Sequence, residues 1–255
     1  MKYKVLGLIL VFIFGLANLA GADQLSQARS LFYQGNNYYG DGDFAQAVAN
    51  YEGALTLGFS SGPLYYNLGN AYFKQGSLGK AILNYLRAKR LMPRDADLNS
   101  NLEYAQSQID GGVIKPGGNW LWRLFFRLVT AFSLDELYLF SAGVYVILAL
   151  FLIVLILSKT ANKPLTYLVY ALTVILIISA GLSAAQFRQT VSLRQAVVTA
   201  GQLYSKFEPF TDATTYFSLS EGETVFVLDS KDEWAKVRRL DGRLGWVKQS
   251  EIELL

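Results

Sequence analysis

Two long apolar runs constrain the fold of this 255-residue chain more than any other feature. Residues 137–158 and 165–186 each form a run of 22 residues without a formal charge. A helix rises about 1.5 Å per residue, so each run is about 33 Å long and spans a hydrocarbon core of roughly 30 Å. Because only the six residues KTANKP separate the runs, the sequence predicts an antiparallel transmembrane hairpin.

The ends of this hairpin carry helix signals. Ser133 and Glu136 have the spacing of a capping box before the first span, and Pro164 suits the first turn of the second. Neither span contains Asp, Glu, Lys or Arg, whereas proton relays and ion pathways depend on ionisable groups within the membrane. The spans therefore predict an anchor and argue against a transporter.

Residues 1–22 have the organisation of a secretory signal peptide. Two lysines precede an apolar run at 5–16, and Ala20-Gly21-Ala22 supplies a cleavage site, so we expect cleavage after Ala22. The signal sends the chain across the membrane, and two spans return it to the same side. The two lysines of the KTANKP turn fit a cytoplasmic loop. An uncleaved signal would also leave both flanking domains outside the cytoplasm.

Two segments connect the N-terminal region to the hairpin. Residues 111–118, GGVIKPGG, show no periodicity and predict a linker. Residues 119–133 combine two Trp with Arg123 and Arg127, which favours a helix at the membrane interface. The alternative is that this stretch packs against the helices that follow it.

Residues 25–110 carry an internal repeat with a period of 34 residues. GNNYYGDGDFAQAVANYEGA starts at Gly35, and GNAYFKQGSLGKAILNYLRA starts at Gly69. The pattern resembles the tetratricopeptide repeat, a helix–turn–helix unit of the same length, with repeats at 28–61 and 62–95. Stacked repeats usually end in a cap, so residues 96–109 are predicted to be a capping helix or a degraded third repeat.

The repeat also predicts close packing within each unit. Gly69 and Ala81 would let the paired helices approach each other, and Tyr72 and Tyr85 would fill the space between them. Pro93 is expected to end the second helix of the second repeat.

The resemblance implies a concave groove, lined by outward positions of each first helix, that binds a peptide or one face of a helix. Asparagine can pair with a peptide backbone, and rings supply apolar contact area. The alternative is that Asn36 and Asn70 are solvated and that the rings pack between helices. The predicted groove residues are Phe32, Asn36, Tyr39, Tyr66, Asn67, Asn70, Phe73, Asn101 and Tyr104.

Residues 196–255 consist of short β-rich runs separated by turn residues. Asp241-Gly242 is a hairpin signal, and EGETVFVLDSKDEWAKVRRLDGRLGWVK resembles bacterial Src-homology-3-like (SH3-like) barrels. The chain has YSKFEPFTD where many relatives carry an Arg-Ser-Gly-Pro-like stretch, which leaves any ligand role of that stretch open. The barrel aromatics would form either a ligand surface or the core of a small barrel; they are Tyr204, Phe207, Tyr216, Trp234 and Trp246.

Composition excludes several classes of chemistry. The chain has no His and no Cys, which removes Ser-His-Asp relays, thiolate zinc sites and disulfides. The acidic pairs, such as Asp41 with Asp43, lie in turns or at helix starts without a convergent second group. With a net charge of +3 and scattered basic residues, nothing favours a nucleic-acid partner. We therefore expect no catalytic site, no metal site and no cofactor.

The expected fold class is multidomain α and β: an all-α tetratricopeptide-repeat solenoid, a two-helix transmembrane hairpin and a small all-β SH3-like barrel. This order of parts resembles the BatE-type proteins of the Bacteroides-aerotolerance (Bat) operons. The resemblance implies a bacterial inner-membrane protein with both domains in the periplasm. It also implies envelope partners, chiefly membrane-bound von Willebrand factor A-type Bat proteins beside a MoxR-type ATPase.

Two functions follow as hypotheses. The first is a non-enzymatic, membrane-anchored scaffold that binds envelope proteins through the repeat groove and is linked to aerotolerance. The second is a cell-wall binding protein whose barrel holds peptidoglycan stem peptides while the repeats act as a spacer.

Overall fold

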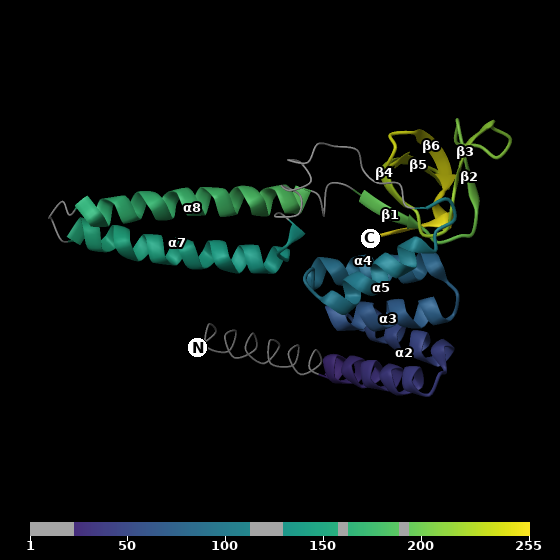
Figure 1. Cartoon of the computed structure of the whole chain (residues 1–255), viewed down its shortest axis with the longest axis horizontal. Helices are drawn as coiled ribbons and strands as arrows, with labels where there is room; N and C mark the ends of the chain where they lie inside the picture. The colour runs from purple at the N-terminus through teal and green to yellow at the C-terminus, as the bar shows by residue number, and fades with distance from the viewer. Residues whose placement is uncertain (1–22, 113–129, 158–162, 189–193) are drawn as a thin grey trace, which may run out of the picture.

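The computed structural model describes residues 23–112, 130–157, 163–188 and 194–255 (Figure 1). Within these ranges it contains stacked helices, two long apolar helices and an antiparallel sheet, which confirms the expected fold class. The predicted signal peptide at 1–22 lies outside the described residues. So do residues 113–118 of the predicted linker and residues 119–129 of the predicted interfacial helix.

The helices of the repeat region stack in chain order (Figure 1). A helix at 23–40 is followed by α2 (Phe44–Thr56), α3 (Gly62–Lys74), α4 (Leu78–Leu91) and α5 (Ala96–Ser107). Local capping sets three of the starts. The side chains of Asp43, Ser61 and Asp95 accept hydrogen bonds from backbone amides three residues later, at 3.0, 3.3 and 2.8 Å.

Each repeat closes around a glycine and a tyrosine, as the sequence predicts. A Cβ on Gly69 would lie 2.6 Å from Cδ1 of Tyr85, and a Cβ on Gly35 would lie 2.7 Å from Cδ1 of Tyr51. Both rings are almost completely buried, at 2% and 1% exposure. Only glycine leaves room for a tyrosine ring against the first helix.

The N-terminal end of the stack is polar where an inner repeat is apolar. In α3, Leu64, Leu68 and Ala71 are buried. The positions 34 residues earlier are Ser30, Gln34 and Asn37, which are all exposed. A polar outer face is what a terminal repeat needs, because no further repeat covers it.

Helix α5 packs in the same way as the first helix of a repeat. Leu98, Leu102 and Ala105 are buried at the positions that correspond to the buried residues of α3. Glu103 replaces the glycine of the earlier repeats and is exposed. No second helix packs at this position within the described residues, so α5 does not need the glycine.

Helices α7 (Leu134–Leu157) and α8 (Lys163–Phe187) form the antiparallel hairpin, and both are long and apolar enough to cross a membrane. They start a few residues before the predicted spans. The predicted capping box is present: Ser133 N donates to Glu136 Oε2 at 2.8 Å, and Glu136 N donates to Ser133 Oγ at 3.2 Å. Arg94, in the α4–α5 turn, forms an ion pair with Glu136 and connects the repeat stack to the start of α7.

The C-terminal region is a seven-stranded antiparallel sheet in the order β3-β2-β6-β5-β4-β1-β7. The predicted Asp241-Gly242 turn joins β5 to β6, with Gly242 at φ 93°. The inward side chains of alternate positions form a separate apolar core. The strands are β1 (Arg194–Val198), β2 (Leu203–Lys206), β3 (Thr215–Leu219), β4 (Thr224–Lys231), β5 (Trp234–Arg239), β6 (Leu244–Lys248) and β7 (Ile252–Leu254).

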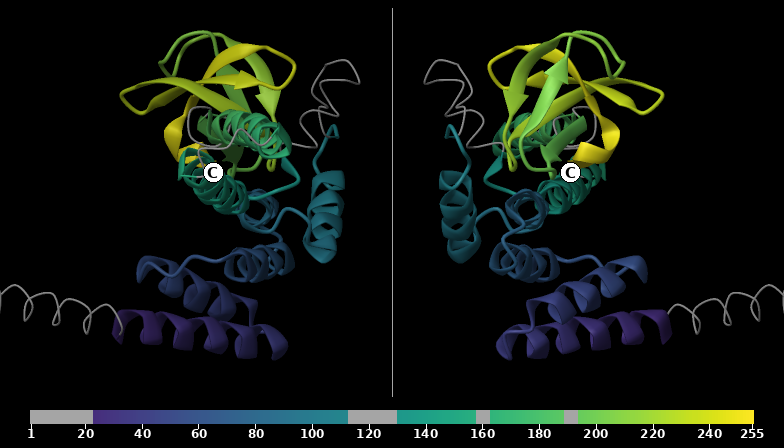
Figure 2. Two further views of the ribbon diagram at one scale, coloured as in Figure 1. Left: turned by 90° about the vertical axis from the view of Figure 1, so that its left-hand side faces the viewer. Right: turned by 90° about the vertical axis from the view of Figure 1, so that its right-hand side faces the viewer.

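The barrel packs against α4, at the opposite end of the stack from the helix at 23–40 (Figure 2). The Glu221 carboxylate accepts a hydrogen bond from Gly79 N at 2.7 Å and so caps the first turn of α4. Arg87 forms an ion pair with Glu253 at 3.0 Å. Among the described residues, the barrel therefore covers the end of the stack at α4.

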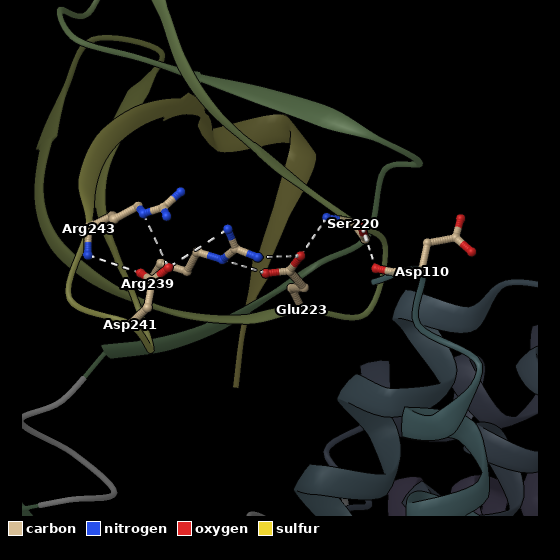
Figure 3. Close-up of polar contacts among 6 residues, drawn as sticks. All are labelled: Asp110, Ser220, Glu223, Arg239, Asp241 and Arg243. Carbon is tan, nitrogen blue, oxygen red and sulfur yellow. Dashed lines mark hydrogen bonds and ion pairs between the residues drawn. The ribbon is translucent and has the colours of Figure 1, made fainter. Parts of the chain in front are cut away.

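A chain of polar contacts extends from this junction into the barrel (Figure 3). Ser220 Oγ donates to the backbone oxygen of Asp110 at 3.0 Å, and Ser220 N donates to Glu223 Oε1 at 3.0 Å. Glu223 is 7% exposed and forms an ion pair with Arg239 at 3.0 Å. This buried pair holds the loop that contacts the end of the repeat stack.

We predict that Gly79→Ala separates the barrel from α4. A Cβ there would collide with the Val198 carbonyl oxygen and lie 2.9 Å from Thr199 Cα, and backbone atoms cannot rotate away. The chain has no cysteine, so cysteines placed at Arg90 and Gln195, which touch across the junction at 3.4 Å, can be joined by a bismaleimide. The yield should fall with Gly79→Ala and persist with Gly201→Ala, where a Cβ meets nothing within 4 Å. Equal yields would contradict the prediction.

Candidate functional site

Four asparagines of the predicted groove form two hydrogen-bonded pairs across the stack. Asn67 Nδ2 donates to Asn36 Oδ1 at 2.8 Å, and Asn101 Nδ2 donates to Asn70 Oδ1 at 3.0 Å. The partners in each pair are 31 residues apart, so the same contact recurs between successive first helices. We call these four residues the amide face.

Tyrosines from the second helices hold the side chains of the amide face in place through hydrogen bonds. Tyr51 Oη donates to Asn36 Oδ1 at 2.8 Å, and Tyr85 Oη donates to Asn70 Oδ1 at 2.8 Å. The Asn101 amide also donates to Tyr66 Oη at 2.9 Å. The carboxamide oxygens of Asn36 and Asn70 thus accept two hydrogen bonds each, which corrects the alternative that these asparagines are merely solvated.

This arrangement leaves amide donors in fixed directions. Asn36 Nδ2 and Asn70 Nδ2 donate no hydrogen bond to another described residue, and both side chains are partly exposed. An asparagine whose oxygen is held by two donors keeps its NH2 group available at a set orientation. The amide face can therefore donate to peptide carbonyl oxygens without first ordering its own side chains.

Aromatic rings border the amide face along its length. Phe73 and Tyr104 are in contact with ring centroids 5.7 Å apart, and Phe32 lies 6.1 Å from Phe59. Tyr104 is 59% exposed, whereas the other rings of the predicted groove are partly buried by neighbouring helices. Tyr39 contacts Phe44 at 5.3 Å. The nine predicted residues therefore line the same side of the first helices, with Tyr104 the most accessible of the rings.

We call Tyr51 and Tyr85 the positioning tyrosines, because their hydroxyls hold Asn36 and Asn70. The sequence pattern indicated only a packing role for tyrosines of the second helices. The signal that would have identified them is a second spacing. Asn36 and Tyr51 are 15 residues apart, and Asn70 and Tyr85 are also 15 residues apart. When an asparagine and a tyrosine recur at the same spacing in both repeats, the spacing indicates that the two side chains form a hydrogen bond in each repeat, in addition to the apolar packing of the ring.

Burial raises the pKa of the positioning tyrosines. The pKa of Tyr51 rises from the ordinary 10.0 to about 12, first because the ring is buried and then because Tyr39 lies nearby. The pKa of Tyr85 is also raised, chiefly by burial and then by the neighbouring Tyr66. Both hydroxyls therefore stay protonated and donate to their asparagines over the physiological pH range.

We predict that the repeat stack loses stability above pH 10. A hydroxyl with a raised pKa contributes stability that is fully present below the unfolded pKa of 10.0 and is lost as pH rises towards about 12. Tyr51→Phe should lower stability by about 1 kcal/mol at neutral pH, since it removes one hydrogen bond. The variant should then lose less than the wild type between pH 10 and 12. Thermal unfolding followed by far-UV circular dichroism at each pH measures both effects, and identical losses in the two proteins would contradict the prediction.

The barrel aromatics divide into two groups. Tyr204, Phe207 and Tyr216 are exposed at 54%, 53% and 45%, and Phe207 stacks on Tyr216 with centroids 4.3 Å apart. Trp234 is buried and Trp246 is partly buried, so these two act in packing more than the other three. Of the two sequence alternatives, the ligand surface fits the first group and the packing role fits Trp234.

The acidic residues considered at the sequence level have local structural partners. The side chain of Asp43 caps α2 and that of Glu136 caps α7, while Asp232 occupies the β4–β5 turn at φ 51°. Among the described residues, no group of three or more His, Cys, Asp or Glu side chains could hold a metal ion.

Two family models match parts of the chain. Residues 69–109 match the family described as TPR repeat, and residues 207–253 match the family described as Bacterial SH3 domain. No curated protein matches the chain. Both domain types typically bind other molecules without catalysis, and the second is associated with the bacterial envelope and the cell wall. The chain therefore combines matches to two domain types that usually bind other molecules with two helices that are apolar enough to cross a membrane.

Proposed function

We propose that this protein is a non-enzymatic scaffold, anchored in the bacterial inner membrane, that binds a segment of a partner protein on the amide face. The amide face supports this function because its oxygens are held by the protein itself, which leaves oriented donors beside an exposed ring. The same geometry would suit an extended peptide whose carbonyl oxygens meet Asn36 and Asn70. Binding without a prior ordering step favours affinity even on a short surface.

The proposed setting is the periplasmic side of the membrane. If the chain carries a signal peptide at 1–22, two spans place the repeats and the barrel on the same side. The resemblance to BatE-type proteins then suggests membrane-bound von Willebrand factor A-type Bat proteins as partners, in an envelope complex linked to aerotolerance. Two weak contacts on one anchor would reinforce each other, because the second becomes intramolecular once the first has formed.

Site-specific photocrosslinking in intact membranes tests the amide face. A benzoylphenylalanine in place of Tyr104 should crosslink to a von Willebrand factor A-type Bat protein expressed in the same cells. The matched control replaces Tyr38, an exposed tyrosine on another side of the helix at 23–40, and should give little product. Equal yields at the two positions, or no product at Tyr104, would count against the proposal.

A second function is favoured by the exposed rings of the barrel. Phe207 stacked on Tyr216, with Tyr204 nearby in the sheet, offers an apolar shelf of the kind that would hold a peptidoglycan stem peptide. The full-length protein in neutral detergent can be pelleted with purified sacculi. Strong pelleting that is lost in the Phe207→Ser/Tyr216→Ser double variant would support cell-wall binding, and no pelleting of the wild type would reject it.

A further inference from the structure

The outer face of the barrel carries a group of cations without acidic partners. Among the described residues, none of Lys206, Lys236, Arg238 and Lys248 forms an ion pair, whereas the ion pairs of the barrel involve Arg239, Arg243 and Glu253. The chain as a whole has a net charge of only +3, so this is a local concentration of positive charge. We call these four residues the basic face.

Strand register places the basic face on adjacent strands. Trp246 of β6 is paired with Lys206 of β2 on one side and with Lys236 of β5 on the other. In the neighbouring rows, Trp234 is paired with Lys248, and Phe226 of β4 is paired with Arg238. Cations and rings therefore alternate over β2, β6 and β5 on the side of the sheet that faces away from the core. On β4 the residue opposite Lys236 is the exposed Asp229, which forms no ion pair with a described residue, so the four cations outnumber the acid beside them.

Three rings on these strands each lie close to a cation. Arg238 Cζ lies 5.3 Å from the Phe226 centroid, Lys236 Nζ lies 5.9 Å from that of Trp246, and Lys248 Nζ lies 6.0 Å from that of Trp234. Trp234 is 6% exposed. The rings therefore attract the basic side chains across the sheet, and the four basic residues remain partly exposed.

We propose that the basic face binds an extended acidic segment of a partner protein. Lys236 and Arg238 are two residues apart on β5, which is about 6.6 Å along a strand. An extended segment presents every second side chain on one face at that same spacing, so Glu or Asp at alternate positions matches the cations. The inference rests on the proposed scaffold function and gives the barrel the second contact of that scaffold.

Two features favour a protein segment over an anionic membrane as the occupant. A face that inserts into a membrane presents its rings outward without neighbouring charge, whereas Phe226, Trp234 and Trp246 each lie beside a cation. Strand β2, which carries Lys206, lies on the side of the barrel away from α7 and α8 (Figure 1). Binding of the basic face to an anionic membrane is therefore the alternative that the experiment must distinguish.

Fluorescence anisotropy with the full-length protein in neutral detergent tests the proposal. The probe is a fluorescein-labelled model peptide with glutamate at every second position and small apolar residues between, and its counterpart has glutamine for each glutamate. The glutamate peptide should bind, bind less as salt rises, and bind about tenfold more weakly to the Lys206→Gln/Lys236→Gln variant. The Lys74→Gln/Lys80→Gln variant loses the same charge from the repeat region and should bind like the wild type.

Several outcomes would overturn the proposal. These are no binding of the glutamate peptide, equal binding of the glutamine peptide, or equal weakening in the two double variants. If phosphatidylglycerol vesicles or sacculi bind through the same two lysines and the peptide does not, the occupant is the membrane or the cell wall. If the glutamate peptide does not bind but the Tyr104 crosslink is retained, only the proposal for the basic face is refuted. If the Tyr104 crosslink is lost, the proposal for the amide face is refuted.

Discussion

Replacing Glu223 with glutamine is expected to lower the free energy of unfolding of the barrel by about 3 kcal/mol. The Glu223 carboxylate is 7% exposed and accepts hydrogen bonds from Arg239 Nε at 3.0 Å and Arg239 Nη2 at 3.3 Å. Without the negative charge of Glu223, the largely buried Arg239 guanidinium keeps only the Asp241 carboxylate as a counter-charge, and that carboxylate is more distant, at 3.9 Å. Denaturant unfolding, followed by tryptophan fluorescence in a Trp120→Phe/Trp122→Phe background, reports on Trp234 and Trp246 in the barrel alone.

The control for this prediction lies in the same network (Figure 3). Arg243 pairs with Asp241 at 3.4 Å and is 55% exposed, so Arg243→Gln should change stability by at most about 0.5 kcal/mol. Replacing Glu223 and Arg239 together with methionine should cost less than Glu223→Gln, because no unpaired charge remains buried. A Glu223→Gln barrel as stable as the Arg243→Gln barrel would contradict the assignment of this pair as structural.

The repeat stack could be predicted from the sequence because its determinants are local and recur. Gly69, Ala81 and Tyr85 lie within one unit, and the previous unit carries the same residue types 34 positions earlier. Spacing alone then indicates which residues meet. The polar end of the stack follows the same logic, since Ser30, Gln34 and Asn37 replace the apolar residues of α3.

The sequence predicted which residues make up the amide face, but it did not predict the hydrogen bonds that hold their side chains in place. The sequence places Asn36, Asn67, Asn70 and Asn101 on one side of the first helices, because helical periodicity sets which residues share a face. It does not show that Asn36 and Asn70 accept hydrogen bonds from tyrosines of the second helices. That contact depends on how far a side chain reaches between two helices, and a one-dimensional pattern carries no such distance.

The junction between the barrel and α4 has no sequence signature of its own. Gly79 lies in the first turn of α4, and glycine weakens a helix by roughly 0.5–1 kcal/mol relative to alanine. A glycine at this position therefore suggests that another part of the chain lies close to it. That neighbour is the backbone at Val198, which is 119 positions further along the chain (198 − 79). Gly222 has the same role on the barrel side, since a Cβ there would lie 2.6 Å from Ile82 Cδ1.

The basic face was also beyond the sequence patterns. The β-rich runs and the Asp241-Gly242 turn indicate strands, but strand order decides which of them become neighbours. Lys206 on β2 meets Trp246 on β6 because β2 pairs with β6 in the sheet. A pairing between strands so distant in the chain brings together charges that look scattered along it.

Gly69→Val is expected to destabilise the second repeat by about 3 kcal/mol. A Cβ at this position would lie 2.6 Å from Tyr85 Cδ1 and 3.3 Å from the Ala81 backbone oxygen. The ring of Tyr85 is buried and its hydroxyl is held by Asn70, so it cannot move aside without breaking that hydrogen bond. Hydrogen exchange of peptides from residues 62–109 should show faster exchange, and the disturbance of Asn70 should also reduce the Tyr104 crosslink.

Two further variants separate this clash from a general effect of valine in a helix. Gly40 ends the helix at 23–40 with nothing within 4 Å of a Cβ, so Gly40→Val should leave exchange of the repeat helices close to that of the wild type. In a Tyr85→Leu background the ring is absent, and the additional cost of Gly69→Val should fall by at least half, because two residues in contact are not independent. If Gly69→Val costs the same with and without the Tyr85 ring, the close approach of the two helices does not depend on this glycine. The packing that positions the amide face would then need another explanation.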